Sequence, residues 1–250
     1  MIVYEFPLNE RVRTLLRIES LYQRAEYFKS RADAQEHHVA ILSLFEILDV
    51  AGRADLKSEL MQELERKKHQ LDALKGNPSV EQSMLASIIE ETEQAIAGLF
   101  TTSGKTGQEL RENEWLMAIR QRTAIPGGVC EFDLPSYHHW MHSSAEHRRQ
   151  DLEQWLAPFE PMRVGANLIL RLLRESGKTS PQTAEQGKFQ QMLAGRLAQM
   201  LRLKLDDDYA CVPEVSANKY AINIRFATHM GSQRKTSEEN VDFELTFCNL

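Results

Sequence analysis

The chain has 250 residues, a formal net charge of −6, 42% apolar residues and 26% charged residues, a balance typical of globular proteins with one large or two modest domains. The acidic total argues against general nucleic-acid binding, and no apolar run approaches the roughly 18 residues that span a bilayer. Residues 1–6 have no basic region before an apolar stretch, so we expect no export signal and a soluble, cytoplasmic protein. The three widely spaced cysteines, Cys130, Cys211 and Cys248, are then expected to be reduced and buried.

The first half of the sequence predicts one short strand followed by helices. Residues 2–6 alternate and stop at Pro7, which predicts a strand, and Asn9 can cap a helix that runs to about Ser30. Four arginines of this helix, Arg13, Arg17, Arg24 and Arg31, lie within about 40° of one another opposite its apolar side. Further helices are predicted over about 39–50, which is apolar nearly all round, and over 56–74, 79–99 and 108–122. The short turn at residues 76–78 makes two of them an antiparallel hairpin.

After residue 124 the pattern changes. Residues 129–134 predict a short central strand, helices follow at about 136–142, 145–157 and 163–175, and 177–187 has the composition of a linker. Strict alternation over 201–205, 220–226 and 241–247 predicts antiparallel strands with one buried face. The predicted fold class is α+β, with a mostly helical domain (9–124 and 136–178) and an antiparallel β domain (1–8, 125–135 and 185–250). In the β domain the C-terminal strands are joined by the N-terminal strand and the central strand.

Two stretches resemble the end of a phosphate-binding loop, Thr102–Thr106 and Ser176–Thr179. In both, leucine (Leu99 and Leu172) stands where the first glycine of the motif should be. A helix is also expected before the first stretch, where the motif needs a buried strand. An interhelical loop is therefore favoured over a nucleotide site.

Candidate metal ligands are equally incomplete. His138 and His142 have the spacing of zinc ligands on a helix, with His147 nearby, but no motif fixes a third ligand, and packing around Trp140 and Trp155 is favoured. Residues 206–208, three aspartates, lack the glycine and the closing glutamate of a calcium loop, which favours a polar turn. We predict no catalytic residue, no metal and no cofactor.

Basic residues are the remaining candidates for a site. The arginines of the first helix are joined by Arg111, Arg120 and Arg122, and Lys219 and Arg225 are expected to share one face of a late strand. Exposed ion pairs are each worth under about 1 kcal/mol, so spacing alone favours a solvated surface.

Several stretches together resemble the ZapD family of bacterial cell-division proteins. They occur in the same order from residue 5 to residue 245: Phe6-Pro7-Leu8-Asn9-Glu10 with Arg13, Thr14 and Leu16-Arg17-Ile18-Glu19; Arg120-Gln121-Arg122 with Ile125-Pro126-Gly127-Gly128; Phe132-Asp133-Leu134-Pro135 with His138, Trp140 and His142; Ile224-Arg225-Phe226; and Asp242-Phe243-Glu244-Leu245. The resemblance covers essentially the whole chain.

The resemblance implies a non-enzymatic homodimer with a helical domain and a β domain, located at the midcell division ring. It implies that a basic surface binds the C-terminal tail of FtsZ, the tubulin-like division GTPase, and that the dimer bundles FtsZ filaments. The matching basic residues are Arg13, Arg17, Arg111, Lys219 and Arg225. Arg120 and Arg122, or Arg24, are further candidates because Glu114 and Ala221 stand where additional arginines are expected. No nucleic acid and no membrane are expected as partners.

Three rival interpretations remain open. A nucleic-acid-binding module could use the same arginines, and a gel shift with random duplex would detect it. A metal-dependent hydrolase at His138, His142 and His147 would hold stoichiometric zinc. A helical scaffold built on the 53–100 hairpin would lose dimerisation with that hairpin.

Overall fold

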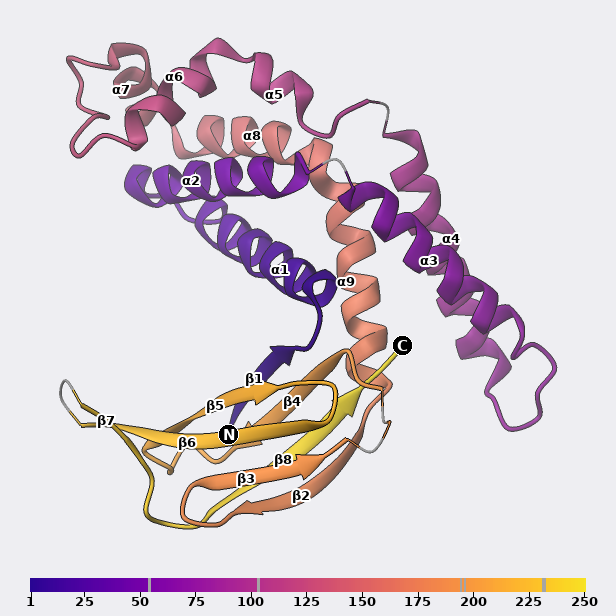
Figure 1. The fold of residues 1–250 in the computed structure, drawn as a ribbon. Coiled ribbons are helices and arrows are strands. Elements are labelled where there is room, and N and C mark those ends of the chain that lie inside the picture. Colours follow the sequence, from indigo (N-terminus) through magenta and orange to yellow (C-terminus); the bar gives the residue numbers. More distant parts are fainter. Residues whose placement is uncertain (54, 103, 194, 196, 231–232) are drawn as a thin grey trace. The chain divides into compact units, whose positions relative to one another are not determined.

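The computed structural model describes residues 1–250 except 54, 103, 194, 196 and 231–232 (Figure 1). It forms two compact units: unit 1 contains residues 1–14 and 170–250, and unit 2 contains residues 15–169. Two helices, α1 (Glu10–Lys29) and α9 (Glu160–Glu175), contribute residues to both units. The remaining helices lie in unit 2 and the described strands lie in unit 1, so the α+β prediction is confirmed.

Unit 2 is built around the apolar helix that the sequence predicts to be central. The following helices lie in this unit: α2 (Ala34–Ala51), α3 (Leu56–Asp72), α4 (Gln82–Thr101), α5 (Gln108–Glu112), α6 (Glu114–Thr123), α7 (Pro135–Met141), α8 (Ala145–Leu156) and the 3-10 turn η1 (Ala157–Phe159). Helix α2 begins at its cap Asp33, whose side chain accepts the N–H of Gln35, and packs on α8. Its residues Ile41, Leu44 and Leu48 are completely buried, which confirms the central position.

Helices α3 and α4 form the predicted antiparallel hairpin. The hairpin has a small hydrophobic core near the turn that joins the two helices. Leu71 of α3 packs there with Leu85 and Ile89 of α4. Gly165 of α9 lies beside the hairpin, since a Cβ there would be in van der Waals contact with Leu64 and Leu99 at 3.4 Å.

Unit 1 is a sandwich of two antiparallel sheets. The first has the order β1 (Ile2–Pro7), β4 (Met200–Leu205), β8 (Val241–Cys248), β2 (Lys178–Ala184). In the second, β6 (Ala221–Met230) lies between β3 (Lys188–Met192) and β5 (Cys211–Ala217) and also pairs with β7 (Gln233–Thr236). Alternate residues of β4, β6 and β8 form the shared core, where Phe243 meets Phe189 and Phe226 with ring centroids 5.3 and 5.0 Å apart. The N-terminal strand joins the late strands as predicted, with Phe6 opposite Leu201.

The predicted central strand at 129–134 is wrong. These residues form turns, in which the N–H groups of Asp133 and Leu134 both bond to the carbonyl of Cys130 at 3.1 and 3.0 Å. The thiol of Cys130 donates to the Gly127 carbonyl at 2.8 Å and is exposed, whereas Cys211 and Cys248 are buried as expected. Local bonds therefore occupy the backbone groups that a strand partner would need.

The predicted linker at 177–187 is also wrong over most of its length. Residues 178–184 form β2, which pairs along its whole length with β8 at the edge of the first sheet. Pro181 suits that place because an edge strand has one side without ladder bonds. The polar composition that suggested a linker is that of a half-exposed edge strand.

A partly buried ion-pair network joins the last turn of α9 to the first sheet. Glu5 of β1 accepts from Arg174 at 2.8 and 2.7 Å and from its cross-strand neighbour Arg202 at 3.0 Å. Burial raises the pKa of the Glu5 carboxyl, but the two guanidinium groups outweigh burial and hold this pKa below its usual value.

We expect Glu5→Gln to destabilise unit 1 by about 1–3 kcal/mol at neutral pH, because two partly buried cations lose their counter-charge. A carboxyl with a depressed folded-state pKa stabilises above its unfolded value and loses this contribution as the pH falls through the folded value. The wild type should therefore lose stability below about pH 4.5 more steeply than the variant. Hydrogen exchange of β1 and β4 amides measures this. Glu244→Gln, which removes an exposed pair with Lys204 at 3.4 Å, is the control and should cost under about 1 kcal/mol.

Candidate partner-binding site

The first two candidate residues lie together on the exposed side of α1. The Asn9 side chain caps this helix by accepting the N–H of Val12 at 2.8 Å, and Val12, Leu15 and Ile18 bury the opposite side. Arg13 and Arg17, one helical turn apart, are both exposed and adjacent on this surface. The Arg13 Nε pairs with Glu10 at 3.2 Å.

Arg111 has a structural position at the end of α2. Its guanidinium donates to the carbonyl of Leu48 in the last turn of α2, and its Nη2 occupies the space where a Cβ on Gly52 would lie. A cation at this place satisfies a terminal carbonyl and interacts favourably with the helix dipole. The half-buried Arg111 is therefore held inside unit 2, and a ligand would have to compete with this contact.

Arg120 and Arg122 each pair with one carboxylate of unit 2. Both lie in the last turn of α6, where Arg120 pairs with Asp49 of α2 at 2.5 Å and Arg122 with Asp133 at 3.5 Å. These pairs join α6 to neighbouring segments of the same unit. Glu114, which stands where an arginine is expected, is an exposed residue in the first turn of α6, where a negative charge suits the helix dipole.

The last two candidates lie on the second sheet of unit 1. Arg225 of β6 is exposed, and its Nε donates to Glu214 of β5, the residue directly opposite, at 3.0 Å. Lys219 is not on the strand as predicted but in the β5–β6 turn, with its ammonium 4.8 Å from the Tyr220 ring centroid. Ala221, the second departure from the expected pattern, is only 6% exposed.

The candidates are divided between the two units. Arg13, Lys219 and Arg225 belong to unit 1, whereas Arg17, Arg111, Arg120 and Arg122 belong to unit 2. Arg13 and Arg17 come together on α1, while Lys219 and Arg225, six residues apart, can be separated by up to about 20 Å along a strand. The sequence reasoning missed Lys188, which lies directly opposite Arg225 on β3. The sequence pattern did not predict a strand at Lys188, because this residue directly follows the segment with the composition of a linker. Its position opposite Arg225 could therefore not be predicted.

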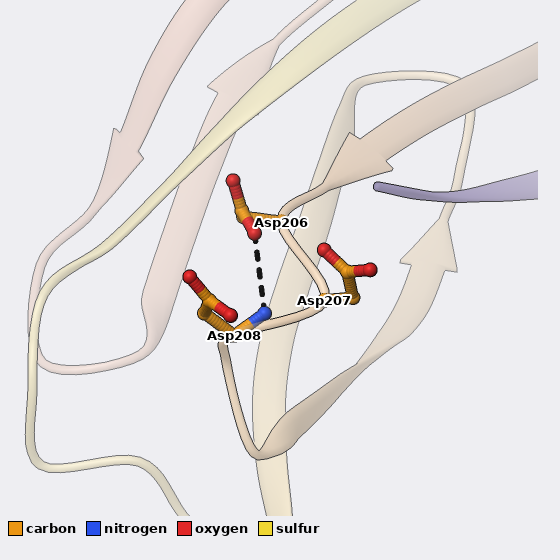
Figure 2. Close-up of side chains that lie close together, drawn as sticks. All are labelled: Asp206, Asp207 and Asp208. Atoms are coloured by element: carbon orange, nitrogen blue, oxygen red, sulfur yellow. Dashed lines mark hydrogen bonds between the residues drawn. The ribbon is translucent and has the colours of Figure 1, made fainter.

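The three aspartates after β4 form a compact turn (Figure 2). Their ligand atoms lie within 4.8 Å of one another, and the Asp208 N–H donates to the Asp206 carboxylate at 3.2 Å. Asp207 pairs with the N-terminal ammonium of Met1 at 2.9 Å. These contacts are those of a polar turn that holds the start of β1, as the sequence favoured.

The other motifs also have local structural contacts. Residues 102–106 connect two helices, as expected, with residue 103 outside the described part; the Lys57 ammonium donates to the Thr102 carbonyl at 2.5 Å. His138 pairs with Glu131 at 3.6 Å and His147 with Asp151 at 3.5 Å, while the His142 ring bonds to the His138 carbonyl at 2.8 Å. All three histidines are exposed; the aromatic cluster of Trp115, Tyr137, Trp140 and Trp155 contacts His38 instead.

Comparison with known proteins decides the family. A family model described as "ZapD: Cell division protein" matches residues 16–225. The chain belongs to the ZapD family of cell division proteins. Curated relatives named "Cell division protein ZapD" are 52% identical over 250 residues in Janthinobacterium sp. (strain Marseille), 53% over 252 in Dechloromonas aromatica (strain RCB) and 51% over 251 in Azoarcus sp. (strain BH72), each over the full length of both chains.

Family membership agrees with the resemblance drawn from the ordered motifs and places the chain in cell division. Within the described residues, every helix is too short or too polar to cross a bilayer.

Proposed function

We propose that this chain is a non-enzymatic cell-division factor that binds the C-terminal tail of FtsZ and cross-links FtsZ filaments at the midcell ring in the cytoplasm. The family assignment and its cell-division role support this proposal. Each subunit binds a short flexible tail through exposed guanidinium groups, and a homodimer carries two such sites.

One observation carries the proposal: two exposed arginines are each paired with one carboxylate. Arg13 pairs with Glu10 and Arg225 with Glu214, and both arginine side chains are about half exposed, at 45% and 53%. Such pairs are worth under about 1 kcal/mol, so exchanging them for a carboxylate of a partner costs little. Guanidinium groups bind carboxylates with two parallel hydrogen bonds, which supplies geometric selectivity.

Weak sites suffice for bundling because the partner is a polymer. Ordering a flexible tail costs conformational entropy, so a single contact should have a Kd on the order of micromolar. A filament presents many tails, and a two-fold particle presents two sites, so avidity holds neighbouring filaments together.

Charge reversal tests the site. We expect Arg17→Glu and Arg225→Glu each to reduce co-sedimentation with FtsZ filaments by about tenfold or more, because each change replaces attraction for the tail with repulsion. Lys75→Glu changes the net charge equally at the hairpin connection between α3 and α4 and should leave bundling unchanged. Equal bundling by all three variants and the wild type would show that the named arginines are not the site.

Salt dependence gives a second measurement. Bundling should weaken as the salt concentration rises towards about 0.5 M, since exposed charge contacts are screened over a Debye length of a few ångströms there. Bundling that does not respond to salt would contradict a charge-based contact. A gel shift with random DNA duplex, at the same salt, distinguishes the nucleic-acid alternative.

A further inference from the structure

The outer face of the second sheet carries a row of three charged residues across adjacent strands. Lys188 of β3 is directly opposite Arg225 of β6, which is directly opposite Glu214 of β5. Lys188 and Arg225 are exposed. Directly opposite residues have Cβ atoms about 5 Å apart, so the two cations are neighbours. The row therefore places two positive groups beside one negative group.

The two cations do not share the carboxylate equally. The Nε and Nη2 atoms of Arg225 both donate to one oxygen of Glu214, so two of its five N–H donors are used there. Among the described residues, no carboxylate lies within ion-pair distance of Lys188. Like charges directly opposite each other destabilise a sheet. A second carboxylate between Lys188 and the remaining guanidinium donors would remove this repulsion.

The surface around the row is hollowed, and polar side chains lie among apolar lining residues there. Together with Gln190, Ser216 and Asn223, the next row of the same face, the three residues line a depression of about 520 Å³. Amide and hydroxyl groups can bond to the backbone of an extended peptide, while the cations select its charge. This chemistry fits an acidic side chain on a peptide segment.

We infer that Lys188 is a binding residue: together with Arg225 it forms a two-cation site for a carboxylate of an acidic peptide, and Glu214 is the internal counter-charge that limits its affinity. The inference rests on the proposed function, in which that peptide is the FtsZ tail, and it adds a residue and a weakening element to the site. Glu214 competes with the incoming carboxylate for the Arg225 guanidinium.

Peptide titration of the full-length protein tests the inference, with a fluorescent FtsZ tail peptide and a capped hexaglutamate peptide as separate probes. We expect Lys188→Ala to weaken binding of both by about tenfold, Lys188→Arg to retain it, and Glu214→Gln to tighten it about threefold. Lys178→Ala is the matched control, because Lys178 is an exposed lysine on β2 of the other sheet of the same unit. It should leave both affinities unchanged.

A double-mutant cycle identifies the contact. Replacing each acidic residue of the tail peptide in turn by its amide should reveal one position whose effect disappears in Lys188→Ala. Melting temperatures of the variants report whether the sheet is intact. If Glu214→Gln unfolds unit 1, the two Lys188 variants and the double-mutant cycle are sufficient to test the two-cation site.

The outcomes separate the two proposals. If the wild type binds the tail but Lys188→Ala and Lys178→Ala behave alike, the proposed function stands and the two-cation site is overturned. If the wild type does not bind the tail, the proposed function fails, and the affinity for the hexaglutamate peptide then tests the two-cation site. Weaker hexaglutamate binding by Lys188→Ala than by Lys178→Ala supports the two-cation site. If the wild type does not bind hexaglutamate, or if the two variants bind it equally, the two-cation site is overturned.

Discussion

Arg148→Ala is expected to destabilise unit 2 by about 3–5 kcal/mol, although Arg148 touches no proposed binding residue. Arg148 is on α8 and only 5% exposed. Its guanidinium donates to the carbonyls of Met141 at 3.1 Å and Ala32 at 2.8 Å, to the carbonyl of Ser143, and to His37 Nδ1 at 2.9 Å. These acceptors lie just beyond α1, at the end of α7 and on α2.

The physical reason is that three segments lose one shared donor. Carbonyls at the ends of helices have no partner within the helix, and here one cation satisfies several of them. Alanine leaves the carbonyls and the His37 nitrogen buried without a bond, and each unsatisfied polar group costs about 1–3 kcal/mol.

Tryptophan fluorescence during urea unfolding measures this effect selectively, because Trp115, Trp140 and Trp155, the three tryptophans of the chain, all lie in unit 2. Arg149→Ala is the control: Arg149, the next residue of α8, pairs with the exposed Glu146 at 3.0 Å, and its replacement should cost under about 1 kcal/mol. Equal midpoints for the two variants would disprove the structural importance of Arg148.

His37 adds a dependence on pH. Burial lowers the pKa of His37, and the positive charges of Arg148 and Arg149 act in the same direction. The folded state therefore favours the neutral ring, which accepts from Arg148 through Nδ1 and donates through Nε2 to the Arg31 carbonyl at 2.9 Å. The neutral His37 ring stabilises the folded state fully above about pH 6.5. This stabilisation is lost as the pH falls towards the lower folded-state pKa of His37.

Gly107→Ala should cost about 2–5 kcal/mol, the second large effect. Gly107 has φ of +74°, which costs a residue with a side chain about 1–2 kcal/mol. A Cβ there would also lie 2.5 Å from Leu48 Cδ1 and 2.7 Å from the Phe159 ring, both completely buried. Overpacking of this kind adds about 1–3 kcal/mol.

Gly104→Ala separates the two contributions. Gly104 lies in the same loop with φ of +70°, and a Cβ there would meet no atom within 4 Å. This variant should therefore cost only the backbone contribution, about 1–2 kcal/mol. If both alanine variants unfold at the same urea concentration, the contact of Gly107 with the core is not what excludes a side chain.

The sequence predicted the elements whose side chains follow one strong period. Strands β4, β6 and β8 alternate strictly, and α2 is apolar nearly all round, so burial alone determines their type. Strand β2 escaped because its polar residues and Pro181 satisfy the rules of a loop as well as those of a sheet edge. The strand prediction for residues 129–134 was wrong because a short apolar pattern does not reveal competing hydrogen bonds within a turn. Here those bonds are donated to the Cys130 carbonyl.

The candidate site was predictable in residue type but not in surroundings. Arg13 and Arg17 could be placed on an exposed helix side by counting residues, because helix geometry fixes that face. The position of Arg111 at the end of α2 depends on Gly52, 59 residues earlier in the chain, and no local pattern encodes such a contact. The pairing of Lys188 with Arg225 depends likewise on a register between strands distant in sequence.

The pairing of β1 with β4 has a consequence for synthesis on the ribosome. Once Phe6 has been made, its partner Leu201 follows only after nearly 200 more residues. At about 5–20 residues per second, β1 waits on the order of 10 s or longer without a strand partner, while all helices of unit 2 are completed. Strand β8, in the interior of the same sheet, is translated later than β4. A chain truncated before residue 241 would therefore lack the interior strand of this sheet, and a protease assay should find β1 protected in the full chain but not in the truncated one.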